Sequence, residues 1–301
     1  MAKSYNQIYE RERDSLLSLL EANQQMEYKK QYNCKTIKAG DQLEVQLYEV
    51  WDTKSRNKGK AEKPSRQRQE KLNHRYSQLR CVRLINENIT EKDSWITLTY
   101  TALNRPATME QAEKNIKNYI ARVKRAFPDT ELKYVYTIEY GDSWAHHHVV
   151  CNIRDRDKLE VLWTSASELA RKRKNPAYYV RKYGRTNARR LQPDDFAMTG
   201  MGNYISKEGN GKNKKKFVCS KNLKKPEEKV SKTLKGRRLT RAFIKKLAED
   251  KAAAKLELLK LFPQCQFNDL DVRQTPYTKG YYIYARLKII PDSGGKMAIT
   301  T

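Results

Sequence analysis

The sequence predicts an α+β fold, because strand-like segments alternate with amphipathic helical segments through the middle of the chain. Residues 95–100 are rich in β-branched and aromatic side chains, as strands are, and residues 133–140 and 144–151 have the same character. Residues 108–126 carry apolar side chains at helical spacing. Turn residues at 141–143 join two of the strands as a hairpin, so the sheet is expected to be at least partly antiparallel.

The remaining elements follow from the same periodicities and from capping and turn residues. Helices are expected at 1–30, 64–86, 156–172, 194–207 and 239–261, and extended segments at 184–191 and 281–289. The polar, basic residues 53–66 are expected to be a link. These features predict three parts, which are an N-terminal helical and basic appendage with its linker (1–60), a main domain (61–230), and a C-terminal basic helix with a final strand packed on the core (231–301).

The chain is strongly basic, with 62 lysine and arginine residues against 35 aspartate and glutamate residues and a formal net charge of +27. Such an excess indicates a polyanionic partner, and nucleic acid is the default because phosphate neutralisation drives its binding. No apolar run approaches the roughly 20 residues of a spanning helix, and the first residues lack the apolar stretch of a signal peptide. Five widely spaced cysteines without a Cys-x-x-Cys pair disfavour a disulfide framework or a zinc ribbon, and favour the cytoplasm.

Three of the four histidines lie together at positions 146–148, in a segment predicted to be a strand. Side chains alternate along a strand, so His146 and His148 share one face and His147 points to the other. Two imidazoles on one face suit a divalent metal, although a pair of histidines on a strand is often only a partly exposed polar pair. The hairpin places Glu139 beside them as a third, oxygen ligand.

Tyr204 and Lys207 are three residues apart, so they share a face if this segment is helical. A tyrosine can act as a covalent nucleophile, and a nearby ammonium group stabilises its phenolate. The spacing alone is a weak signal in a lysine-rich chain, because Tyr179 and Lys182 have it too.

The order of these features resembles the HUH endonucleases, and most closely the replication initiators of rolling-circle plasmids, single-stranded DNA phages and related mobile elements. Residues 95–100 (Trp-Ile-Thr-Leu-Thr-Tyr) resemble their first motif, residues 146–148 their metal-binding motif and residues 204–207 (Tyr-Ile-Ser-Lys) their nucleophile motif. Residues 220–226 (Ser-Lys-Asn-Leu-Lys-Lys-Pro) are similar to the segment that follows the tyrosine helix in phage-type initiators. In that family the residue between the ligating histidines is usually hydrophobic, and here it is His147.

The resemblance implies a five-stranded antiparallel sheet with flanking helices, on which Glu139, His146 and His148 hold Mg²⁺ or Mn²⁺. It implies that Tyr204, supported by Lys207, nicks single-stranded DNA at a replication origin and forms a 5′-phosphotyrosine intermediate. We prefer Tyr204 to Tyr179 because it directly precedes the segment at 220–226. The chain has no phosphate-binding Gly-x-x-x-x-Gly-Lys loop, so a host helicase is expected to unwind the origin for a host polymerase.

Beyond residue 207, lysines and arginines form successive clusters. One cluster is often only a solvated surface, but their succession favours a track for the DNA backbone. The residues predicted to contact DNA are Lys214, Lys215, Lys216, Lys224, Lys225, Arg237 and Arg238. Two other functions fit the sequence less well, which are a relaxase or transposase of the same superfamily and a non-catalytic basic nucleic-acid-binding protein.

Overall fold

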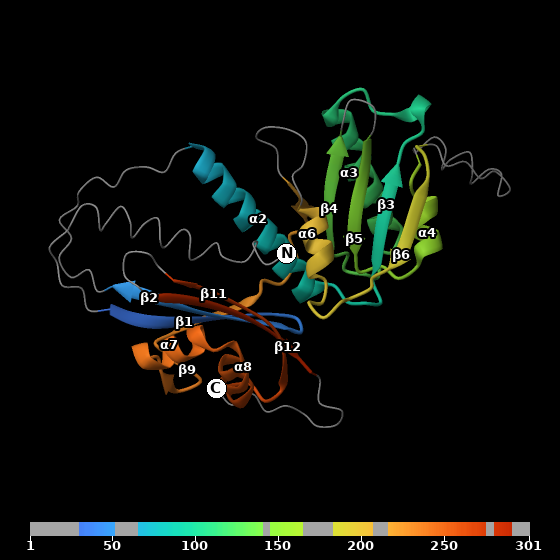
Figure 1. The fold of residues 1–301 in the computed structure, drawn as a ribbon. Coiled ribbons are helices and arrows are strands. Elements are labelled where there is room, and N and C mark those ends of the chain that lie inside the picture. The colour runs from blue at the N-terminus through green and yellow to red at the C-terminus, as the bar shows by residue number, and fades with distance from the viewer. Residues whose placement is uncertain are drawn as a thin grey trace. The chain divides into compact units, whose positions relative to one another are not determined.

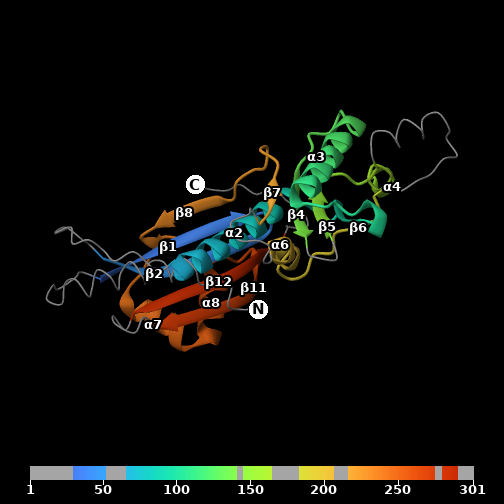
Figure 2. The ribbon, with the colours of Figure 1, turned by 90° about the horizontal axis from the view of Figure 1, so that it is seen from above.

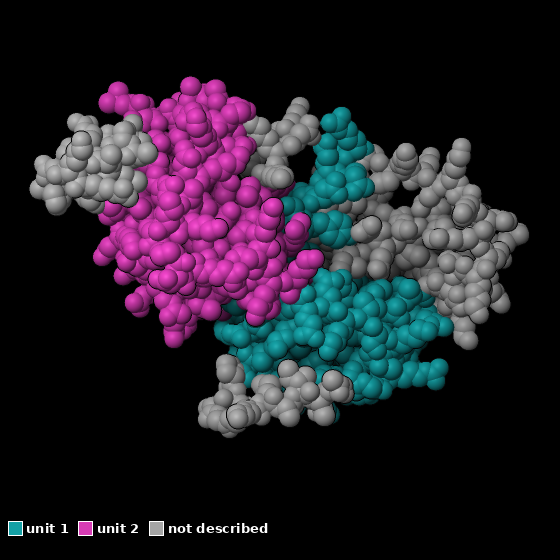
Figure 3. All heavy atoms as spheres, turned by 180° about the vertical axis from the view of Figure 1, so that it is seen from behind, with its two compact units in different colours: residues 1–79, 195–197, 226–301 teal, residues 80–194, 198–225 magenta. Residues whose placement is uncertain are grey.

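The computed structural model describes residues 30–51, 66–140, 145–164, 183–206, 216–274 and 280–290. The chain divides into two compact units, which Figure 3 colours separately. Unit 1 comprises residues 1–79, 195–197 and 226–301, and unit 2 comprises residues 80–194 and 198–225. Helices and antiparallel strands occur in both, so the predicted α+β class is confirmed.

Unit 2 contains the sheet that the sequence predicts. Its five strands are in the order β6-β3-β5-β4-β7, and each pairing is antiparallel (Figure 1). The strands are β3 (Ser94–Thr99), β4 (Tyr134–Tyr140), β5 (Ala145–Cys151), β6 (Thr186–Arg190) and β7 (Val218–Cys219). The expected five-stranded antiparallel sheet with flanking helices is therefore confirmed.

Helices cover both faces of this sheet because β3, β4 and β5 carry apolar side chains on both sides. On one face, α3 (Met109–Ala126) and α4 (Arg156–Val161) pack against Ile96, Leu98 and Val149. The other face packs Val135 and Val150 against α6 (Thr199–Ile205) and the C-terminal part of α2 (Arg66–Asn88). The histidine face of β5 is this second face, since His146 and His148 alternate with Val149 and share the side of Val150.

Unit 1 is built on a second five-stranded antiparallel sheet, in the order β11-β12-β2-β1-β8 (Figure 2). Its strands are β1 (Lys30–Ala39), β2 (Gln42–Trp51), β8 (Glu227–Ser231), β11 (Cys265–Gln274) and β12 (Tyr281–Ile289). A two-stranded sheet of β9 (Thr233–Leu234) and β10 (Arg237–Arg238) follows β8. Gly40, with φ of +55°, supplies the left-handed residue of the tight β1–β2 turn.

Two helices, rather than the single helix expected over 239–261, cover one face of this sheet. They are α7 (Arg241–Glu249) and α8 (Lys251–Leu261), and they bury Phe243, Ile244 and Leu258 against the strands. Asp250 separates them because it has an extended backbone, and its carboxylate accepts hydrogen bonds from the Ala252 and Ala253 amides. An aspartate that caps a new helix in this way ends the preceding one.

The hairpin of β1 and β2 was not predicted from sequence, and β2 pairs with β12 from the other end of the chain. The helix expected at 1–30, the link at 53–66 and most of the helix expected at 156–172 lie outside the described residues. The expected three-part division stays a prediction about independently folding segments. None of the helices in the described ranges has the length and apolar character required to cross a bilayer.

Candidate metal and nucleophile site

The register of three neighbouring strands brings the predicted ligands together. Glu139 lies opposite His146 in the β4–β5 pairing, and Thr97 of β3 lies opposite His148 on the other side of β5. Directly paired residues in a sheet point to the same face, so the three candidate ligands converge near one end of the sheet.

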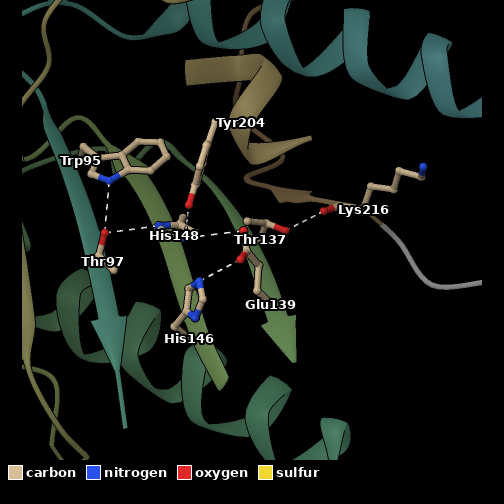
Figure 4. Close-up of polar contacts among 8 residues, drawn as sticks. All are labelled: Trp95, Thr97, Thr137, Glu139, His146, His148, Tyr204 and Lys216. Carbon is tan, nitrogen blue, oxygen red and sulfur yellow. Dashed lines mark hydrogen bonds and ion pairs between the residues drawn. The ribbon is translucent and has the colours of Figure 1, made fainter. Parts of the chain in front are cut away.

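The ligand atoms of Glu139, His146 and His148 all lie within 4.8 Å of one another. One Glu139 carboxylate oxygen is 2.8 Å from His146 Nε2, and the other is 3.6 Å from His148 Nε2 (Figure 4). Two imidazole nitrogens and one carboxylate suit a divalent cation and leave coordination positions open for a substrate. The residues present therefore fit a metal ion.

Tyr204 approaches the same cluster from α6, on the face of the sheet that carries the histidines. Its hydroxyl lies 3.4 Å from His148 Nε2, and the two rings meet edge to face with centroids 4.9 Å apart. The side chain is 44 % exposed, so the phenol reaches solvent while its oxygen faces the ligands. A substrate can therefore reach the hydroxyl without any rearrangement of the core.

α6 is held by α2 rather than by its own cap. Its N-cap residue Met198 has no capping side chain, and the Met198 amide instead donates to Asn86 Oδ1 of α2 at 2.9 Å. Ala197, with φ of +51°, breaks the chain direction just before the helix. The helix therefore begins at Thr199, later than the acidic start expected at residues 194–195.

Burial controls protonation at the site. Burial lowers the pKa of His148 to about 4, although the Glu139 carboxylate opposes this shift. The imidazole is thus neutral at pH 7, as a metal ligand must be. The pKa of Tyr204 is raised, first by burial and then by the charge of Glu139. Without a cation, the site favours the neutral phenol.

His147 lies on the opposite face, as strand alternation predicts. It is fully buried, and its Nε2 lies 2.8 Å from the Tyr100 hydroxyl, which in turn accepts a hydrogen bond from Asn115. Its ring packs edge to face on Trp163. The structure therefore brings His146 and His148, and not His147, to Glu139.

Residues 93–208 match the family model described as a replication-associated protein of the ORF2 type. This segment belongs to that family. The replication-associated segment runs from the start of β3 to just past α6, so it contains Glu139, His146, His148 and Tyr204. It supports a role in replication initiation and an interaction with DNA. No curated protein and no solved structure significantly matches the chain.

The basic residues predicted to contact DNA have different surroundings. Lys224 and Lys225 are exposed, and the Lys224 backbone is fixed by two hydrogen bonds to the Asn88 side chain. The Lys216 carbonyl accepts a hydrogen bond from Thr137, and its side chain extends away from Tyr204 (Figure 4). Arg237 forms a 2.8 Å ion pair with Glu257, whereas Arg238 is exposed. Three predicted residues lie outside the described ranges, which are Lys207, Lys214 and Lys215.

The segment at 220–226, which follows the basic residues, fastens β7 to β4. Ser220 Oγ accepts from the Tyr134 amide at 3.1 Å, and Asn222 donates to the Leu132 carbonyl at 3.2 Å. Leu223 packs into the core beneath α6. These contacts give the motif a structural role in the replication-associated fold.

Sequence reasoning assigned no role to Trp95, Thr97, Asn86 or Gly202, all of which contact the site or the helix that carries Tyr204. A glycine within a predicted helix was the one available signal, since glycine there is unfavourable and implies a close approach. A β-carbon on Gly202 would lie 2.7 Å from the Val82 Cα of α2. The two helices can therefore pack this closely only with glycine at this position.

Gly202→Ala is expected to displace α6 from α2, because the clash is with backbone that cannot rotate away. We expect a loss of about 1–3 kcal/mol of stability and slower reaction of Tyr204, measured by thermal unfolding and by the rate of covalent DNA adduct formation. Gly200→Ala is the matched control in the same helix, since its β-carbon would meet only a side-chain oxygen of Asp194 at 3.6 Å. Equal behaviour of the two variants would contradict this packing argument.

Acid should destabilise the fold through His147. Burial lowers its pKa to about 3, below the ordinary value of 6.5. The unfolded state thus binds the proton more readily, and the stabilisation is complete above pH 6.5 and is lost as the pH falls toward 3. Between pH 6.5 and 5 the loss from this residue is about 2 kcal/mol. Thermal unfolding in EDTA should show a smaller decrease over this pH range for His147→Phe, and an unchanged decrease would refute the assignment.

Proposed function

We propose that this protein is a metal-dependent, site-specific enzyme that nicks and joins single-stranded DNA to initiate rolling-circle replication. One observation carries the proposal, which is that the Tyr204 hydroxyl lies 3.4 Å from a histidine of a three-residue metal cluster. The family match of residues 93–208 supports it independently. Covalent catalysis by tyrosine on phosphate requires this combination of a nucleophile and a means to neutralise charge.

Glu139, His146 and His148 would hold the cation through one oxygen and two nitrogens. When bound, Mg²⁺ or Mn²⁺ polarises the scissile phosphate and offsets the charge of Glu139 that disfavours the Tyr204 phenolate. The choice of these two ions rests on the family resemblance, because two imidazoles and a carboxylate could equally hold zinc.

In the proposed step, Tyr204 loses its phenolic proton to solvent and its oxygen attacks the phosphorus in line. The bond between phosphorus and the 3′-oxygen breaks, and that oxygen takes a proton and leaves as a 3′-hydroxyl. The products are a 5′-phosphotyrosine on the enzyme and a free 3′ end that primes synthesis. Lys207 is proposed to stabilise the phenolate or a phosphate oxygen. A later 3′-hydroxyl can attack the phosphotyrosine, which releases Tyr204 and closes a circle.

The basic residues are proposed to bind the DNA backbone along the path to this site. Lys224, Lys225 and Arg238 are exposed and suited to phosphate contact, whereas Arg237 would first have to leave Glu257. The partners would be single-stranded DNA at the origin and a host helicase and polymerase, in the host cytoplasm.

A covalent-adduct assay tests the proposal. Purified protein is incubated with Mn²⁺ and single-stranded oligonucleotides that tile its own replicon, and the products are separated on a denaturing gel. A shifted band that EDTA prevents is expected with the origin strand only. Tight DNA binding without an adduct on any strand would instead favour a non-catalytic binding protein.

A further inference from the structure

We propose that Thr97 is a positioning residue for His148, and that Trp95 fixes the Thr97 hydroxyl in place. Through this arrangement the imidazole presents Nε2 to the cation with its proton held on Nδ1. The inference rests on the metal site of the proposed function but not on the nicking reaction. Neither residue carries a predicted role beyond membership of the first sequence motif.

The geometry places Thr97 at the far side of the His148 ring from Glu139. Thr97 pairs with His148 in the β3–β5 register, and its Oγ1 lies 3.3 Å from Nδ1. The other ring nitrogen, Nε2, lies 3.6 Å from Glu139. The His148 side chain is only 6 % exposed, so water cannot readily replace the hydroxyl. Within the described ranges no other residue hydrogen-bonds to Nδ1.

Trp95 determines which lone pairs remain on Thr97. Its indole nitrogen can only donate, and it donates to Thr97 Oγ1 at 3.2 Å. A hydroxyl oxygen has a second lone pair, which can accept the Nδ1 proton of His148. A neutral imidazole that binds a metal through Nε2 must carry its proton on Nδ1, and an acceptor there fixes both the tautomer and the ring orientation.

Trp95 also joins the ligand to the nucleophile. Its ring centroid lies 5.2 Å from that of His148 and 5.7 Å from that of Tyr204, the latter edge to face. Figure 4 shows the row from Trp95 through Thr97 to His148, with Tyr204 above it. The two β3 side chains are two residues apart and so lie on the same face of the strand.

Thr137 offers a matched control. It pairs with His148 from the opposite strand, β4, and is likewise a threonine on the same face. Its hydroxyl, however, donates to the Lys216 carbonyl at 2.9 Å instead of contacting the imidazole. Thr137→Val thus removes an equivalent hydroxyl without removing a partner of His148.

The test is Mn²⁺ affinity, measured from the electron paramagnetic resonance signal of free Mn²⁺ in the absence of DNA. We expect Thr97→Val, which keeps the side-chain shape, to weaken binding by about 10–100-fold. Thr97→Ser and Thr137→Val should bind Mn²⁺ like the wild type. Unchanged affinity in Thr97→Val, or equal weakening in Thr137→Val, would overturn the proposal, and so would a wild-type protein that binds no Mn²⁺.

A second measurement needs no substitution. Nitrogen-15 spectra of histidine-labelled wild-type protein with Mg²⁺ report which ring nitrogen of His148 carries the proton. A proton on Nδ1 is expected, and a proton on Nε2 would overturn the assignment. A wild type that binds Mn²⁺ with the expected Thr97 dependence but forms no DNA adduct would remove the nicking function and leave the role of Thr97 intact.

Discussion

Tyr204→Phe should abolish covalent adduct formation while leaving the fold intact. The phenyl ring keeps the edge-to-face contacts with His148 and Trp95, so only the attacking oxygen is lost. Removal of a nucleophile costs on the order of 10⁴-fold or more in rate. The measurement is adduct yield over time with a labelled origin strand and Mn²⁺, together with the thermal unfolding midpoint.

Tyr179→Phe is the control for this prediction, because Tyr179 has the same spacing to a lysine as Tyr204. It lies outside the described residues and should retain adduct formation. The opposite pattern, in which Tyr179→Phe is inactive and Tyr204→Phe is active, would reassign the nucleophile. Loss in both would indicate that two tyrosines act in the reaction.

His148→Ala has the second largest expected effect. It removes a ligand nitrogen that lies within 4.8 Å of both other ligand atoms, and it also removes the ring on which Tyr204 packs. We expect Mn²⁺ affinity, measured by calorimetry, to fall at least about 100-fold, since even outer contacts of metal ligands contribute 10–100-fold. Adduct formation should fall with it.

His74→Ala is the corresponding control, because His74 is the one histidine outside the cluster at 146–148. It lies on α2, outside the metal cluster, and should leave Mn²⁺ binding unchanged. Adduct formation that persists in His148→Ala, or in EDTA, would show that the reaction does not need this site.

The central sheet and the convergence of the ligands could be predicted because both depend on local patterns. Strand alternation alone puts His146 and His148 on one face, and a short hairpin fixes Glu139 beside them. The opposite placement of His147 follows from the same rule. Tyr204 could be preferred over Tyr179 only through the family resemblance, because the spacing of the two tyrosines to lysine is identical.

Long-range pairing was not predictable in this way. β2 pairs with β12 across most of the chain, and no local pattern specifies which distant strands meet. The break at Asp250 was visible in the sequence as a capping residue, but the apolar spacing of α7 and α8 reads as one helix across it. The roles of Thr97 and Trp95 depend on side-chain distances between strands, which composition does not contain.

The most direct measurement of the central claim is identification of the residue that becomes linked to DNA. The Mn²⁺-dependent adduct would be digested with protease and nuclease, and the modified peptide sequenced by mass spectrometry. The account predicts a nucleotide attached through its 5′-phosphate to Tyr204. Attachment to another residue, or through a 3′-phosphate, would contradict it.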